Sequence, residues 1–133
     1  MTMPLMTTPL WCLLIATFLP FVLSLAGNVL RQRQFGRIDN HHPRLQQAQL
    51  TGAGARALAA QQNAWEALAM FTPAVLVAHL NGATAGQAAI AAMLFVAARV
   101  LHGIFYLADI DWARSLIWVV GFGAIIWLFV LAV

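Results

Sequence analysis

Four long apolar blocks make up most of the chain, and they constrain its fold more than any other feature. They cover about residues 9 to 30, 57 to 80, 84 to 108 and 115 to 133. A helix needs about 20 apolar residues to cross a hydrocarbon core of ~30 Å, and each block is long enough to do so. The sequence therefore predicts a membrane protein with four spans, joined by a cytoplasmic loop over residues 31–54 and two short turns.

The composition and the pattern of these blocks exclude a soluble domain and a β-barrel. Of the 133 residues, 62% are hydrophobic and only 8% are charged, whereas a soluble domain carries about 25% charged residues. Barrel strands alternate in segments of about ten residues, but these blocks are continuous and rich in Ala and Leu. We expect an all-α fold, an integral membrane four-helix bundle in which residues 1–133 form a single transmembrane domain. The first block has no Lys or Arg before it, so we interpret it as a retained span and not as a signal peptide.

The arginines predict the orientation in the membrane. The segment between the first two blocks carries four of them against one acid, whereas the joint HLNGATAGQ between the second and third blocks carries no formal charge. Positive loops face the cytoplasm, so this pattern predicts a multi-pass protein of the bacterial inner membrane with the 31–54 loop inside. The positive charge is explained by this topology signal, no aromatic-interleaved basic surface accompanies it, and nucleic-acid binding is not expected. The charged residues of this segment are Arg31, Arg33, Arg37, Asp39 and Arg44.

The single cysteine and the paired loop histidines give weak functional signals. Cys12 lies inside the first span, where a buried small apolar side chain is the ordinary interpretation and a reactive thiol is the alternative. His41 and His42 precede Pro43 without acidic or cysteine neighbours at ligand spacing, so no metal site is predicted.

Two polar stripes interrupt the second and third blocks. Each stripe has four residues spaced by three, four and three positions, which places their side chains on one face of a helix. Both stripes contain charges and hydrogen-bonding groups at depths that an apolar helix normally fills with hydrocarbon. The residues are Arg56, Ala59, Asn63 and Glu66 in the second block, and Arg99, His102, Tyr106 and Asp109 in the third.

Glu66 and Arg99 are expected at a similar depth of about 15 Å, by helical rise from Arg56 and Asp109. A lone charge there costs roughly 2.5–3.5 kcal/mol, which motivates a hypothesis of a Glu66–Arg99 contact within a subunit or between subunits. One alternative is that the stripes only hold a bundle together through buried hydrogen bonds. The other is a site for an anionic ligand, because the stripes hold more donors than one ion pair needs and Arg114 adds a cation at the start of the fourth span.

The chain resembles the bacterial branch of the MAPEG family, the membrane-associated proteins in eicosanoid and glutathione metabolism. Two segments carry the resemblance, RALAAQQNAWEALAMF and RVLHGIFYLADIDWARS, and it covers roughly residues 5 to 130. The resemblance implies a homotrimer that binds glutathione as a cosubstrate in clefts between subunits. It also implies that Arg114 stabilises the glutathione thiolate and that Tyr106 assists at the sulfur. The positions that match glutathione contacts are Asn63, Glu66, Arg99, His102 and Tyr106, with Arg56 and, as a looser match, Arg33.

The resemblance implies a glutathione transferase or peroxidase-like enzyme in the lipid bilayer that attacks lipophilic small molecules with a thiolate. One departure stands out, because catalytic eukaryotic members have a second arginine where this chain has Ala59. A non-catalytic or differently specific member of the family is therefore the alternative. A small proton-coupled transporter with a titrating Glu66 is a third interpretation, which Arg99 disfavours because a fixed cation keeps the carboxylate charged.

Overall fold

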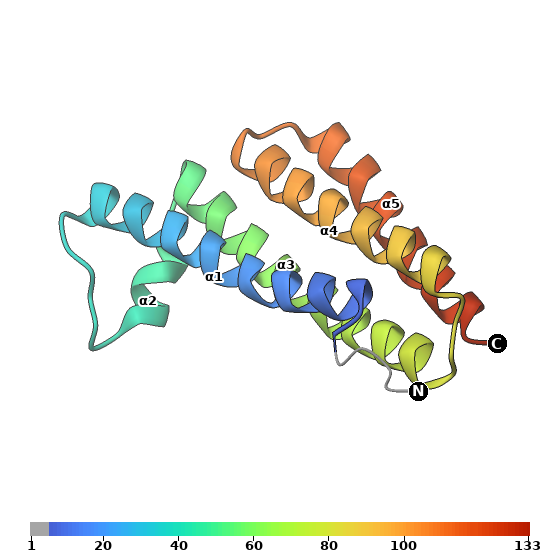
Figure 1. The fold of residues 1–133 in the computed structure, drawn as a ribbon. Helices are drawn as coiled ribbons and strands as arrows, with labels where there is room; N and C mark the ends of the chain where they lie inside the picture. The colour runs from blue at the N-terminus through green and yellow to red at the C-terminus, as the bar shows by residue number, and fades with distance from the viewer. Residues whose placement is uncertain (1–5) are drawn as a thin grey trace.

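A computed structural model of the chain describes residues 6–133 and shows only helices in that range (Figure 1). Four long helices run side by side, and one short helix lies beside the loop at one end of the bundle. The start of the first helix and the end of the last lie at the opposite end. The helices are α1 (Thr8–Phe35), α2 (Pro43–Ala48), α3 (Gly52–Leu80), α4 (Ala85–Leu107) and α5 (Asp111–Leu131).

The all-α prediction is confirmed, and three of the described helices, α1, α4 and α5, are long and apolar enough to cross a membrane. The helix α3 has 29 residues, a length of about 43 Å by helical rise. Because α3 contains several polar residues, however, it is not apolar enough to count as a candidate membrane span by composition. The protein is therefore a membrane protein with a helical fold, and the fourth span stays a prediction.

The predicted loop was too long at both ends. The helix α1 continues to Phe35, and α3 begins at Gly52, so polar helical turns extend beyond the apolar blocks. The helix α1 ends where Gly36 takes a left-handed φ of 75° and its N–H bonds to the Gln32 carbonyl at 2.9 Å, an ending that glycine favours. Pro43 then starts the short α2, where its missing N–H costs nothing. Hydropathy alone misses both features because these turns are polar.

Small side chains, one aromatic pair and a few larger aliphatic side chains such as Leu128 form the core. The main pairs of helices are α1 with α3 and α4 with α5. Alanines at the contacts of α3 and α4 let the backbones approach closely, as is typical of membrane helices. The rings of Phe71 and Phe95 stack with centroids 3.8 Å apart at the centre of this contact. Large apolar side chains such as Phe18 and Val119 remain exposed on the outer faces, which suits a lipid or subunit environment and not water.

The loop before α3 is held by a small set of polar contacts. The Gln46 side chain donates to the Arg37 carbonyl at 2.9 Å and accepts from the Asp39 N–H at 2.9 Å. One Asp39 oxygen accepts from the backbone N–H groups of His41 and His42 at 2.9 and 3.0 Å. The polar residues of this loop therefore shape the chain that leads from α1 into α2.

These contacts make the loop sensitive to acid. The pKa of Asp39 is lowered, first by the hydrogen bond from the His42 N–H and further by that from His41, against a smaller opposing effect of desolvation. A lowered folded-state pKa contributes stability that is present above the unfolded value of about 3.9 and is lost as the pH falls through the folded value. We expect the hydrogen-exchange protection of the His41 and His42 amides to fall as the pH is lowered from about 6 to about 2, that is, from well above to well below the unfolded value.

The control is Asp39→Ala, in which both amides should exchange with low protection at either pH. Equal protection of the two amides at both pH values in the wild-type protein would show that the Asp39 carboxylate does not hold the loop.

Candidate functional site

Asn63 lies at the centre of the first polar group. The Arg99 Nη2 donates a hydrogen bond to Asn63 Oδ1 at 2.8 Å, and Asn63 Nδ2 donates to Glu66 Oε2 at 3.4 Å. Within residues 6–133 the only ion pair joins two other residues, so Glu66 and Arg99 form no direct ion pair inside this chain but share Asn63 as a hydrogen-bond partner. A contact between them across subunits stays a prediction. An amide both donates and accepts. Asn63 therefore connects the cation of α4 to the carboxylate of α3.

The two residues that Asn63 connects, Arg99 and Glu66, differ in burial; we call the three residues the Asn63 relay. Arg99 is 6% exposed in the interior of the bundle, whereas Glu66 is exposed on the outer surface of α3 next to the exposed Trp65. A buried guanidinium needs hydrogen-bond acceptors, and the Asn63 oxygen supplies one. The negative charge of Glu66 consequently lies on the surface of a single chain, where a ligand or a second subunit can reach it.

A second polar group forms where α4 ends and α5 begins. The Arg114 guanidinium carbon lies 4.3 Å from the centroid of the Tyr106 ring, a cation–π distance. The Tyr106 ring meets the His102 ring edge-on, with centroids 5.6 Å apart and an angle of 70°. His102 is 3% exposed, and its Nδ1 has no hydrogen-bond partner within the described chain. The spacing of His102 and Tyr106 along α4 and the position of Arg114 in the first turn of α5 bring the three side chains together.

An open hollow joins the two groups. Its volume is about 360 Å³, at the lower end of the range for small-molecule sites. It combines a cation, an imidazole, a phenol, an amide and a hydroxyl with an apolar wall on α5. An anion that carries both polar and apolar parts matches this lining. The lining residues are Asn63, His102, Tyr106, Arg114, Ser115, Trp118 and Val119.

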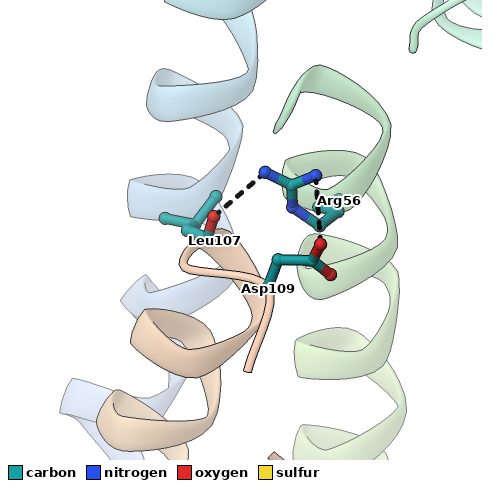
Figure 2. A network of polar contacts seen from close by, with 3 residues as sticks. All are labelled: Arg56, Leu107 and Asp109. Carbon is teal, nitrogen blue, oxygen red and sulfur yellow. Dashed lines mark hydrogen bonds and ion pairs between the residues drawn. The ribbon is translucent and has the colours of Figure 1, made fainter. Parts of the chain in front are cut away.

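Arg56 and Asp109 have a different role from the one that their spacing suggested. Figure 2 shows Arg56 on α3 reaching the turn between α4 and α5, where its Nη1 lies 3.9 Å from Asp109 Oδ2 and its Nη2 donates to the Leu107 carbonyl at 3.4 Å. Asp109 has a φ of 60° in this turn. The pair therefore fastens the start of α3 to the turn that leads into Arg114. Neither residue is part of the hollow's lining, and neither is the exposed Arg33 at the end of α1.

The sequence analysis missed the wall that α5 contributes. Ser115, Trp118 and Val119 line the hollow, but the sequence analysis singled out none of them. Helical spacing could have found them, since Arg114 and Trp118 lie four residues apart and share a face. This face of the fourth block was overlooked because Arg114 is its only charged residue.

The relay yields a stability prediction. In Asn63→Ala the buried Arg99 loses its acceptor and Glu66 loses its donor, so the free energy of unfolding should fall by about 1–3 kcal/mol. Denaturation of the detergent-solubilised protein measures this change. The matched control is Gln62→Ala, the exposed neighbour on α3. Equal stability of the two variants would show that the relay does not support the bundle.

Comparison with known proteins identifies a family for the chain. Residues 8–133 match the model of the MAPEG family, a range that contains all five helices and both polar groups. No curated protein and no solved structure matches the chain. The family implies a membrane protein with a glutathione-related transferase, peroxidase-like or related function. The chain belongs to the MAPEG family.

Proposed function

We propose that this protein is a membrane-embedded, glutathione-dependent transferase or peroxidase-like enzyme that acts on lipophilic electrophiles. The observation that carries the proposal is the position of Arg114, which lies over Tyr106 on the edge of the hollow that His102 and Asn63 also line. A fixed cation in a partly apolar hollow favours the ionised form of a thiol that binds beside it. Membership of the MAPEG family supports glutathione as that thiol.

The chemistry that Arg114 supports is ionisation of the thiol. A thiol with a pKa near 8.5 is only about 3% ionised at pH 7, whereas a downward shift of two units, worth ~2.7 kcal/mol, ionises about three quarters of it. The thiol proton leaves to solvent, and the thiolate is the nucleophile. In this proposal Tyr106, whose ring lies under the guanidinium, donates its O–H to the sulfur.

Two reactions follow from a thiolate at this position. In conjugation, the sulfur forms a bond to an electrophilic carbon while a leaving group departs or a conjugated double bond accepts the electron pair. In peroxide reduction, the sulfur attacks the terminal oxygen of a lipid hydroperoxide and releases the alcohol. A second glutathione then converts the sulfenic acid into a disulfide and water. Apolar side chains of Trp118 and Val119 on the hollow's wall suit a substrate that arrives from the bilayer.

The remaining polar residues suit the binding of glutathione. The tripeptide carries one ammonium group and two carboxylates, so it needs an acid and several cations or donors. The exposed carboxylate of Glu66 suits the ammonium group, and Asn63 offers its amide to the peptide backbone. His102 adds an unused ring nitrogen at the bottom of the hollow. Arg99 supports them by donating a hydrogen bond to Asn63. The exposed Arg33 near the end of α1 offers a further cation, whereas Asp109 engages Arg56.

The subunit and the membrane context belong to the same proposal. We infer a four-span subunit in a homotrimer, with glutathione between subunits and lipid around them. The exposed Glu66 supports a subunit boundary on that side of α3, because a carboxylate at that depth is costly against acyl chains. The turn between α4 and α5 lies at the same end of the bundle as α2 (Figure 1). With the arginine-rich loop in the cytoplasm of a bacterial inner membrane, the hollow opens toward cytoplasmic glutathione.

The second candidate is a non-catalytic or differently specific member of the family. Ala59 and the engagement of Arg56 by Asp109 favour it, since both reduce the number of free cations for glutathione carboxylates. A proton-coupled transporter fits less well, because Asn63 couples Glu66 to the Arg99 cation and the hollow contains Arg114, which repels cationic substrates.

The activity test is the Arg114→Ala variant. Without the cation the thiol returns toward its ordinary pKa, so conjugation of glutathione to a lipophilic electrophile at pH 7 should fall about 10- to 30-fold, and raising the pH should restore part of the rate. Arg37→Gln, which removes an exposed loop arginine, is the matched control and should keep the wild-type rate.

Unchanged turnover in Arg114→Ala, or a loss that is equal at every pH, would contradict a role of Arg114 in thiol ionisation. The oligomeric state of each variant in detergent shows whether assembly is intact.

A further inference from the structure

The short helix α2 and the loop before it carry exposed groups that the proposed chemistry does not use. Two arginines lie there, and an aliphatic residue follows each of them: Ile38 follows Arg37, and Leu45 follows Arg44. All four residues are exposed, Ile38 to 40% and Leu45 to 65%. We call these four residues the loop surface. Cations mixed with aliphatic side chains are typical of segments that lie in the interface of a membrane.

The buried Gln46 holds the two halves of the loop surface together. Gln46 is 8% exposed, its Nε2 donates to the Arg37 carbonyl at 2.9 Å, and its Oε1 accepts from the Asp39 N–H at 2.9 Å. The chain from Arg37 to Asp39 is therefore fixed against α2. Because Gln46 points inward, its neighbours Arg44 and Leu45 lie on the outer side of this short helix. The two arginine–aliphatic pairs are consequently neighbours in the fold.

The level of α2 along the bundle is given by its contacts with the long helices. The apolar run of α1 ends at Leu30, and the polar sequence RQRQ follows it. Leu50, two residues after α2, meets Leu30 at Gly54, where an added Cβ would lie 2.9 Å from Leu50 Cδ2 and 3.7 Å from Leu30 Cβ. Gln47 of α2 and Asn28 of α1 line the same small hollow. The helix α2 therefore lies beside the bundle where α1 changes from apolar to polar (Figure 1), a border that falls in the headgroup region of a membrane.

Two hydrogen bonds keep the chain at this level after α2. The Gln34 Nε2 donates to the Gln49 carbonyl at 3.0 Å, and the Gln34 Oε1 accepts from the Thr51 N–H at 3.0 Å. Gln34 belongs to the last turn of α1, so the linker into α3 is tied to the end of that helix. The loop surface is thus part of the folded structure and is held at the level of the interface.

The charge of this segment favours an anionic partner. Asp39 is the only acid between α1 and α3, and one of its oxygens accepts from the His41 and His42 N–H groups at 2.9 and 3.0 Å. The only ion pair among residues 6–133 joins Arg56 to Asp109, so neither arginine of the loop surface is in an ion pair. Guanidinium groups bind phosphate oxygens in a bidentate manner. An anionic phospholipid offers a phosphate to the arginines and an acyl chain to the aliphatic residues beside them.

We propose that the loop surface binds the headgroups of anionic phospholipids in the leaflet at this end of the bundle. Its two guanidinium groups bind the phosphates, and its two aliphatic side chains reach the start of the acyl chains. Negatively charged leaflets attract basic segments next to a membrane span. The lipid fastens α2 to the membrane and shares no residue with the hollow beside Arg114.

The first test measures which lipids the full-length protein immobilises in vesicles of phosphatidylcholine. Spin-labelled phosphatidylglycerol should be preferred over spin-labelled phosphatidylcholine about tenfold, and salt should weaken the preference. Arg44→Gln should lower the preference about fivefold, because one phosphate-binding cation is lost. The matched control is Arg33→Gln, which removes an exposed arginine that lies between two glutamines and should keep most of the preference.

A second test measures depth and does not depend on the loss of a charge. A nitroxide on Leu45→Cys, in protein that also carries Cys12→Ala, should be relaxed more strongly by oxygen, which concentrates in the bilayer, than by a water-soluble nickel complex. The same label on Asn40→Cys, an exposed polar position of the loop, should show the reverse.

Three outcomes would overturn the proposal. They are the absence of any preference for phosphatidylglycerol in the wild type, an equal loss of preference in Arg33→Gln and Arg44→Gln, and a label at position 45 that is as open to the nickel complex as the label at position 40. The first two would reduce the interaction to the overall charge of the protein. The third would leave the loop surface facing water or a protein partner.

Discussion

The structure depends on one constraint, the need of polar groups inside an apolar helical bundle to find partners within the protein. Arg99 meets this need through Asn63, which in turn reaches Glu66. Because water is scarce at this depth, each group that lacks a partner is costly, and the side chains that remain are consequently held in defined positions. Asn63 on α3 thus both contacts α4 and lines the hollow.

The same constraint places Arg114. The turn between α4 and α5 is fastened to α3 by Arg56 through Asp109 and the Leu107 carbonyl, and α5 begins directly after it. Arg114 then lies in the first turn of α5 over the Tyr106 ring. Residues that seemed equivalent by spacing therefore divide into two kinds. Arg56 and Asp109 set the position of the turn, whereas Tyr106 and Arg114 border the space that a ligand can enter.

The apolar blocks predicted much of the fold, and the limits of that prediction have physical reasons. Long hydrocarbon segments fix where helices form, but the polar turns at the ends of α1 and α3 and the short α2 carry no hydropathy signal. Helical spacing correctly joined Asn63 to Glu66 and His102 to Tyr106. It could not show that Asn63 lies between Glu66 and Arg99, because the rotation of α3 against α4 decides which side chains meet. Nor could it show that Arg31, near the end of α1, is buried.

The central claim is that the hollow beside Arg114 binds glutathione as the thiolate. The most direct measurement is the ultraviolet absorbance of the thiolate while glutathione is added to the detergent-solubilised protein near pH 7. Free glutathione contributes little there, since a thiol with an ordinary pKa is about 3% ionised. The account predicts a thiolate absorbance that saturates with the protein's binding sites. Binding of glutathione without any thiolate absorbance, or no binding at all, would contradict it.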